Sequence, residues 1–124
     1  MSDNRHTSQR FIELLEARNW LAWVALMVPD VVYEMPQTRE RINGRERYLL
    51  FNQEYPGDWH LAARVVLADE REGAVWFDWR LGDETGDGIV FFSFDAAGAI
   101  TGVTDFWPEP YEPPAGREHL VERW

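Results

Sequence analysis

The first part of the chain has apolar residues at helical spacing. This pattern predicts a helix from Thr7, for which Thr7 or Ser8 is available as N-cap. The apolar stripe of this helix consists of Phe11, Ile12, Leu14 and Leu15. A second short helix over residues 20–27 is expected to end before Pro29, because the residue before a proline is disfavoured in helical conformation. The pattern of residues 30–35 then predicts a strand.

The rest of the chain changes from helical to strand-like spacing. A polar loop, 37–44, leads to a third helix, which Pro56 and Gly57 end. One face of this helix carries Tyr48, Phe51, Asn52 and Tyr55. Four strand-like runs follow, at 59–68, 74–81, 88–94 and 99–107. Helices followed by a meander of strands indicate an α+β fold, with the helices packed on one face of a curved antiparallel sheet.

Large apolar side chains occur on both faces of the predicted sheet. Phe77 and Trp79 point to one face, whereas Trp76 and Phe91 point to the other, because successive residues of a strand alternate. If the helices cover the first face, the second is expected to be covered by another subunit. The pattern therefore predicts a homodimer that forms through the outer face of the sheet.

Length and composition favour one domain over residues 1–124. A chain of 124 residues with 45% hydrophobic residues is long enough for one core. Residues 1–6 are polar and 112–124 lie in a proline-rich tail, so both ends are expected to be irregular. With no cysteine, the chain has neither disulfides nor thiolate chemistry. No apolar run reaches the roughly 18 residues of a membrane span, and a cytoplasmic protein is expected.

The charge pattern excludes several partners. The net charge is −10 and every positive residue is an arginine, without a cationic cluster. Nucleic acids and membrane surfaces are therefore not expected as partners, because both need clustered cations. His6, His60 and His119 are far apart, which does not suit a metal site. Residues 82–88, GDETGDG, are acidic and would repel a phosphate group. We expect neither a metal nor a cofactor.

Three stretches of the chain resemble one family. FIELLEARNW, DVVYEMP followed by INGRERYLLF, and FDAAGAITGVTDFW are similar to segments of the nuclear transport factor 2-like superfamily. That superfamily includes ketosteroid isomerases and SnoaL-like polyketide cyclases, and the resemblance covers Phe11 to Trp107. It implies a cone-shaped sheet wrapped around N-terminal helices, a deep apolar pocket for a hydrophobic small molecule, and usually a homodimer.

The same resemblance implies that the chain is not a ketosteroid isomerase in mechanism. Met35 stands where those enzymes have the proton-shuttling aspartate. Phe11 replaces their oxyanion tyrosine and Val90 their oxyanion aspartic acid. The groups that would abstract a proton and stabilise a dienolate are therefore missing from these positions.

The resemblance also implies which strand positions face the pocket. The implied apolar lining is Phe11, Leu15, Met35, Phe51, Leu61, Ala63, Val65, Val75, Phe77, Trp79, Leu81, Val90, Phe92, Val103 and Trp107. Tyr33 and Asn52 are its polar members, and Asp105 is its one carboxylate. Burial among apolar walls raises the pKa of a carboxyl group and suits it to proton transfer near neutral pH. The alternative is that Asp105 caps the end of its strand and fixes the tail.

Two functions follow from this reading. The first is a cofactor-independent SnoaL-like enzyme that acts on a hydrophobic cyclic or polyketide-like molecule. In it Asp105 is the acid and base, while Tyr33 and Asn52 polarise the reacting oxygen. Epoxide hydrolysis in the same pocket is a variant of this function. The second is a non-catalytic module of the same fold that binds a small molecule or dimerises.

Overall fold

The N-terminal helix begins earlier than its apolar pattern indicates. The computed structural model describes residues 3–124, and helix α1 spans Asn4–Glu16. Asp3 is its N-cap and accepts a hydrogen bond from the main-chain N–H of His6 at 3.0 Å. The Asn4 side chain donates to the carbonyl oxygens of Asp69 and Glu70, which ties this first turn to the sheet. The expectation that residues 1–6 are irregular is therefore wrong for residues 4–6, and residues 1 and 2 lie outside the described residues.

The second helix is shorter than predicted. Helix α2 spans Trp20–Val24, and strand β1 already begins at Met27 and runs to Met35. Pro29 lies inside this strand, where the pairing of β1 with β6 is irregular between Met27 and Val32. A proline has no N–H to donate, so an irregular part of the ladder accommodates it.

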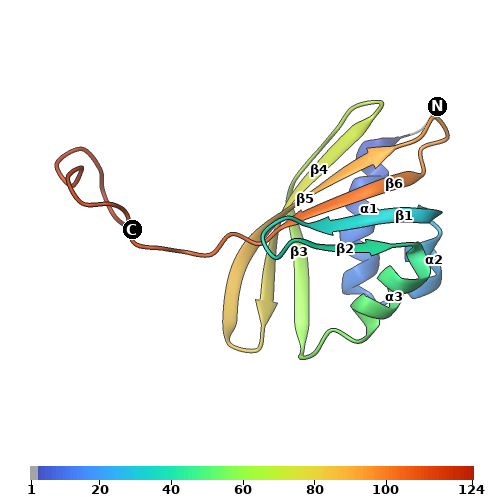
Figure 1. Ribbon diagram of the computed structural model, residues 1–124, viewed down its shortest axis with the longest axis horizontal. Helices are drawn as coiled ribbons and strands as arrows, with labels where there is room; N and C mark the ends of the chain where they lie inside the picture. Colours follow the sequence, from blue (N-terminus) through green and yellow to red (C-terminus); the bar gives the residue numbers. More distant parts are fainter. Residues whose placement is uncertain (1–2) are drawn as a thin grey trace.

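The sheet has six strands in the order β2-β1-β6-β5-β4-β3, and Figure 1 shows it as one twisted, unclosed surface. The remaining strands are β2 (Glu40–Asn43), β3 (Trp59–Ala68), β4 (Glu72–Leu81), β5 (Glu84–Phe94) and β6 (Ile100–Phe106). All neighbours are antiparallel except β1 and β6, which are parallel. The α+β prediction is confirmed, with this one parallel pair added to a sheet predicted as antiparallel.

Two segments predicted as loops belong to strands. Residues 40–43 form β2, because their main chain pairs with the edge of β1 while their polar side chains stay largely exposed. Residues 84–88 extend β5 along β4, with Trp79 opposite Gly86 and Phe77 opposite Gly88. The alternation of apolar and polar residues does not reveal either strand, because both segments consist mainly of polar residues and glycines.

The helices cover the concave face of the sheet at one end. Helix α1 and helix α3 (Arg45–Gln53) lie on this face in Figure 1, and α2 joins α1 to β1. Trp23 is fully buried and packs against Phe11 and Tyr48 at ring distances of 5.5 and 5.0 Å. Among residues 3–124, no helix combines the length and the apolarity that crossing a membrane requires. Residues 107–124 contain no helix or strand, and the chain runs away from the body after residues 107–109, which still line the cavity wall (Figure 1).

Candidate active site

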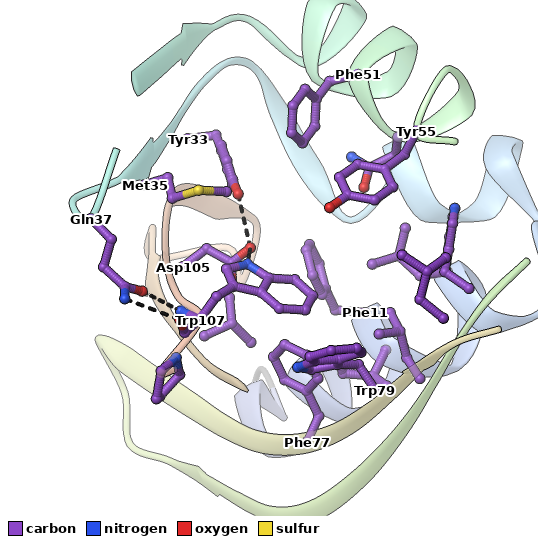
Figure 2. Close-up of a pocket in the computed structure, with 18 of the residues that line it drawn as sticks. Phe11, Tyr33, Met35, Gln37, Phe51, Tyr55, Phe77, Trp79, Asp105 and Trp107 are labelled. Atoms are coloured by element: carbon purple, nitrogen blue, oxygen red, sulfur yellow. Dashed lines mark hydrogen bonds between the residues drawn. The ribbon is translucent and has the colours of Figure 1, made fainter. Parts of the chain in front are cut away.

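A cavity of about 410 Å³ opens between helices α1 and α3 and the concave face of the sheet. Nine aromatic side chains contribute to its wall, and Figure 2 shows several of these rings around one central space. The aromatic lining residues are Phe11, Tyr33, Tyr48, Phe51, Tyr55, Trp59, Phe77, Trp79 and Trp107. A cavity of this size and polarity is in the range that encloses a drug-sized apolar molecule, roughly 300–1,000 Å³.

Asp105 lies in the wall of this cavity with its two oxygens in different environments. Its Oδ2 accepts hydrogen bonds from the Tyr33 hydroxyl and from the Trp107 indole N–H, both at 2.8 Å. Its Oδ1 is buried and has no hydrogen-bond partner. Burial raises the pKa of Asp105 to about 6, although the two donors act to lower it. The carboxyl group is therefore held by one oxygen and is ready to exchange a proton near neutral pH.

The end of β6 is fixed by Gln37, which lies in the turn after the neighbouring strand β1. The Gln37 side chain donates through Nε2 to the main-chain oxygen of Trp107 at 3.0 Å and accepts from its main-chain N–H through Oε1. The side-chain amide thus continues the ladder between β1 and β6 by one step. Since Trp107 holds Asp105, this amide also helps to orient the carboxylate (Figure 2).

Two glycines allow the aromatic floor of the cavity to form. A Cβ atom at Gly86 would lie 2.5 Å from the Trp79 ring, and one at Gly88 would lie 2.5 Å from the Phe77 ring. Without these side chains both rings lie directly over β5. Trp107 then packs on their other side, with ring distances of 5.4 Å to Phe77 and 6.0 Å to Trp79.

Tyr33 and Asn52 both line the cavity, and each already donates one hydrogen bond within the protein. The one hydroxyl proton of Tyr33 goes to Asp105, and its ring stacks on Tyr48 at 4.5 Å. Burial and the charge of Asp105 raise the pKa of Tyr33 far above its ordinary value. Asn52 donates through Nδ2 to the main-chain oxygen of Tyr48 at 2.9 Å. Tyr33 therefore orients the carboxylate, which leaves its hydroxyl without a proton for a ligand.

Strand alternation assigned most of the predicted apolar residues to the correct face of the sheet, but it did not show which of them reach the cavity and which lie in the filled core. Ten of the apolar residues assigned to the pocket line the cavity, namely Phe11, Leu15, Met35, Phe51, Leu61, Phe77, Trp79, Leu81, Val90 and Trp107. Phe92 and Val103 do not, because helix α1 covers their part of the sheet and leaves them 2% and 1% exposed in the core. Val75 lies in the core for the same reason. Val65 is 41% exposed because the register of β3 shifts between Ala63 and Val65 and pairs Val65 with Trp76 of the outer face. Ala63 pairs with Phe77 but is also exposed, on the edge strand of the sheet.

Sequence reasoning missed three residues of the site. Tyr48 and Tyr55 share the helical face of Phe51 and Asn52, which was a sufficient signal for placing them here. Figure 2 shows the Tyr55 hydroxyl pointing into the cavity. Burial and the charge of Asp105 raise the pKa of Tyr48 well above its ordinary value. Gln37 gave no signal, because a glutamine in a polar loop is indistinguishable from a solvated one.

The described residues offer no set of ligands for a metal ion. Within residues 3–124 there is no group of three or more His, Asp or Glu side chains suited to one. His60, on the outer side of the cavity wall, instead bonds to Glu16 and Asp58, each at 2.9 Å. The chemistry that the arrangement itself supplies is proton transfer at Asp105 inside an aromatic cavity.

Comparisons with known proteins agree with this fold and cavity. Residues 8–103 match the SnoaL-like domain family, to which the chain therefore belongs. A Kribbella flavida DSM 17836 structure, provisionally named a ketosteroid isomerase, is 51% identical with a TM-score of 0.94 and covers 98% of this chain and 89% of its own. The comparison with curated proteins gave no match.

More distant structures share the fold alone. An NTF2-like protein of unknown function from Burkholderia xenovorans LB400 is 18% identical, with a TM-score of 0.82 over 98% of this chain and 94% of its own. A Xanthomonas campestris pv. campestris protein, provisionally named a polyketide cyclase, is 22% identical, with a TM-score of 0.66 over 86% of this chain and 93% of its own. The predicted membership of the nuclear transport factor 2-like superfamily, in its SnoaL-like branch, is confirmed.

Proposed function

We propose that this chain is a cofactor-independent enzyme that carries out general acid-base chemistry on a hydrophobic cyclic or polyketide-like small molecule. The reaction class is a cyclisation, isomerisation or dehydration, each of which needs a proton removed and a proton returned. The observation that carries the proposal is Asp105, a carboxyl group inside an aromatic cavity with one oxygen bound by two donors and the other by none. Such a group is a typical general base.

Asp105 has the protonation behaviour that this chemistry requires. With a pKa of about 6, it is about nine-tenths ionised at pH 7 and takes up a proton readily. The proton goes to Oδ1, because Oδ2 already accepts from Tyr33 and Trp107. Oδ1 is buried, and a small turn about the soft Cβ–Cγ bond, within the reach of the two donors to Oδ2, would bring it toward a ligand in the cavity that Asp105 lines.

The proposed base differs in position from that of ketosteroid isomerases. Met35, Phe11 and Val90, at the three positions compared above, line the cavity as apolar groups. Proton transfer would therefore come from the end of β6 and not from β1. The same apolar walls exclude water from the ligand and favour a molecule without charge.

The proposal can be tested with a substrate that needs only a base in a dry aromatic pocket. In 5-nitrobenzisoxazole, removal of the ring C–H proton breaks the N–O bond and releases a coloured nitrophenolate. We expect the protein to accelerate this elimination, with a rate that rises with pH through a midpoint near 6. Asp105→Asn should lower the rate by about 100-fold or more, because a positioned base contributes about 10²–10⁴.

The control for this experiment is Asp30→Asn, which removes an exposed carboxylate of β1. This variant should keep the wild-type rate and midpoint. A rate that Asp105→Asn leaves unchanged, or one without a midpoint between pH 5 and 7, would contradict the assignment of Asp105 as the base.

A second candidate function is a ligand-binding module without catalysis. The observation in its favour is that the Tyr33 hydroxyl and the Trp107 indole N–H both donate to Asp105. These two donors are therefore unavailable to a developing oxyanion. The probe 2-naphthol separates the two functions. An enzyme should lose elimination activity in Asp105→Asn with less than about a threefold change in naphthol affinity, whereas a binder should show the affinity without acceleration in either protein.

We also propose the homodimer through the outer face of the sheet. An outer-face patch crosses four strands and consists of Val65, Leu67, Trp76, Ile89, Phe91 and Phe106. Phe91 is 46% exposed, and Arg64 and Asp87 hold the Trp76 indole in place. Phe91→Asp should shift the protein toward monomer in sedimentation equilibrium, whereas Leu21→Asp, at an 85% exposed residue of α2, should not. A dimer that survives Phe91→Asp would refute this interface.

A further inference from the structure

The last residues of the chain, 108–124, form an arm that stands away from the fold. Four prolines, at 108, 110, 113 and 114, stiffen its first half, because polyproline segments are extended and hold their direction over several residues. Figure 1 shows the arm leaving the sheet after β6 and turning back only near its end. Within residues 3–124, no hydrogen bond or ion pair joins 110–124 to the body of the chain.

The end of the arm is apolar although nothing in its own chain covers it. Leu120 is 76% exposed, Val121 is 47% exposed and Trp124 is fully exposed. The arm nevertheless has local structure. Leu120 donates to the Arg117 carbonyl at 3.0 Å, and Arg123 reaches back to Glu112 at 3.4 Å. A turn that presents three apolar side chains to solvent is typical of a segment that packs against another molecule.

The match with the similar Kribbella flavida structure extends into this arm. Its match covers 98% of this chain, so only 2% of 124 residues, about two or three, remain unmatched. Most of the 17 residues of 108–124 therefore lie within the matched span, in a protein that is 51% identical with a TM-score of 0.94. A matching segment in a similar protein favours a role for the arm, and its lack of bonds to its own fold favours a partner outside that fold.

A wide open groove separates the end of the arm from the outer face of the sheet. Trp124 borders it on one side, and His60, Arg64 and Trp76 border it on the other. Its volume is about 860 Å³, and Trp76 belongs to the outer-face patch. A body that covers the patch and enters this groove would contact the arm as well.

We propose that the arm is exchanged between two copies of this chain, with residues 117–124 of each copy packed against the other. A second copy fits because the chain carries both uncovered apolar surfaces, the patch and the arm, and a two-fold dimer buries each of them twice. The prolines lower the entropy that the arm loses on docking. The arm adds to the paired-sheet homodimer proposed above and is tested separately from it.

The first experiment measures dimerisation of the full chain by sedimentation equilibrium. The triple variant L120D/V121D/W124D should weaken the dimer by about 100-fold or more, because burial of each apolar side chain contributes about 1.5–3 kcal/mol when complete. Leu21→Asp, a charge at an 85% exposed residue of α2 outside the arm and the patch, should change it by less than about threefold. The arm makes no bond to its own body, so the melting temperature of the monomer should stay the same.

The second experiment uses the absence of cysteine in the natural chain. Val121→Cys is labelled with a benzophenone maleimide, mixed with an equal amount of ¹⁵N-labelled chain without cysteine, and irradiated. We expect light-to-heavy crosslinks, which can only join two copies. Crosslinks confined to the light chain's own body would contradict the exchanged arm. So would a dimer that Phe91→Asp dissociates but the triple variant leaves unchanged. Either result would be compatible with the homodimer through paired sheets.

Discussion

The concave face of the sheet has a closed end and an open end, and the two are built from the same strands. On β6, Val103 is 1% exposed in the core, while Asp105, two residues later and facing the same way, reaches the cavity. The difference is what lies above them. Helix α1 presses on the closed end, where Phe11 meets Phe92 at 4.8 Å, but does not fill the open end. One strand therefore serves stability at one end and chemistry at the other.

The largest expected difference between the ends is in packing. Phe92, at the closed end, and Phe77, at the open end, are each 2% exposed. Phe92→Ala should lower the free energy of unfolding by about 3–5 kcal/mol, because it leaves a void in a filled core. Phe77→Ala should cost at least about 1 kcal/mol less, since its ring already faces the cavity on one side. Urea denaturation of both variants measures the comparison.

One result would contradict the predicted difference in packing between the two ends. Equal losses in the two variants would mean that the open end is packed as tightly as the closed end in solution. The binding of 2-naphthol gives a second measure of the difference between the two ends. Phe77→Ala enlarges the cavity, whereas Phe92 does not line it.

The next effect concerns the free energy that the folded protein loses when Asp105 ionises at the open end. The pKa of Asp105 is about 6 in the folded protein, against an ordinary value of 3.8, so the folded state binds this proton more tightly than the unfolded state. The resulting stabilisation is complete below about pH 4 and is lost as the pH rises through about 6. Asp105→Asn does not ionise, so its stability relative to wild type should increase by about 2 kcal/mol between pH 4 and pH 8.

This prediction is checked by chemical denaturation of both proteins across that pH range, with Asp30→Asn as the control. A difference that stays constant with pH would show that Asp105 is hydrated in the native state. In that case the alternative reading from the sequence, a carboxylate that only caps the strand end, would be the better one.

The sequence predicted the facing of most pocket positions because strand alternation fixes it. It did not predict how deep each position lies, since the depth of Phe92 and Val103 depends on where helix α1 crosses the sheet. The side of the sheet predicted for Val65 was also wrong, because the register of β3 shifts just before this residue. Depth and bulges arise from packing between distant segments, which a local pattern does not contain.

The candidate site was predictable to a similar extent. A single carboxylate among apolar positions was enough to single out Asp105, and the partners named for it, Tyr33 and Asn52, do line the same cavity. The sequence did not show that Tyr33 donates to Asp105 itself, because that depends on the pairing of β1 with β6 across 72 residues. Gln37 was hidden for the same reason.

A smaller effect separates the two tyrosines of the open end. Tyr33→Phe removes a donor to Asp105 while keeping the ring that stacks on Tyr48, so the pKa of Asp105 should rise further, at a cost of about 1 kcal/mol to the ionised form. The midpoint of the pH–rate profile should move upward accordingly. Tyr55→Phe removes a hydroxyl that points into the cavity without a bond to Asp105, and it should leave the midpoint in place. Equal midpoints in the two variants would contradict the role of Tyr33.

The smallest expected effect is that of Gln37, which acts on the carboxylate through one intermediate. Gln37→Ala removes both bonds to the Trp107 main chain, but the indole keeps its contacts with Phe77 and Trp79. We expect a loss of stability below about 1 kcal/mol and a slower elimination with an upward midpoint, because Trp107 then holds Asp105 less firmly. Thr38→Ala, in the same turn, removes a single 3.4 Å bond to Met35 and should leave the midpoint unchanged. If Gln37→Ala alters stability alone, the glutamine fastens the end of the strand and has no part in orienting the carboxylate.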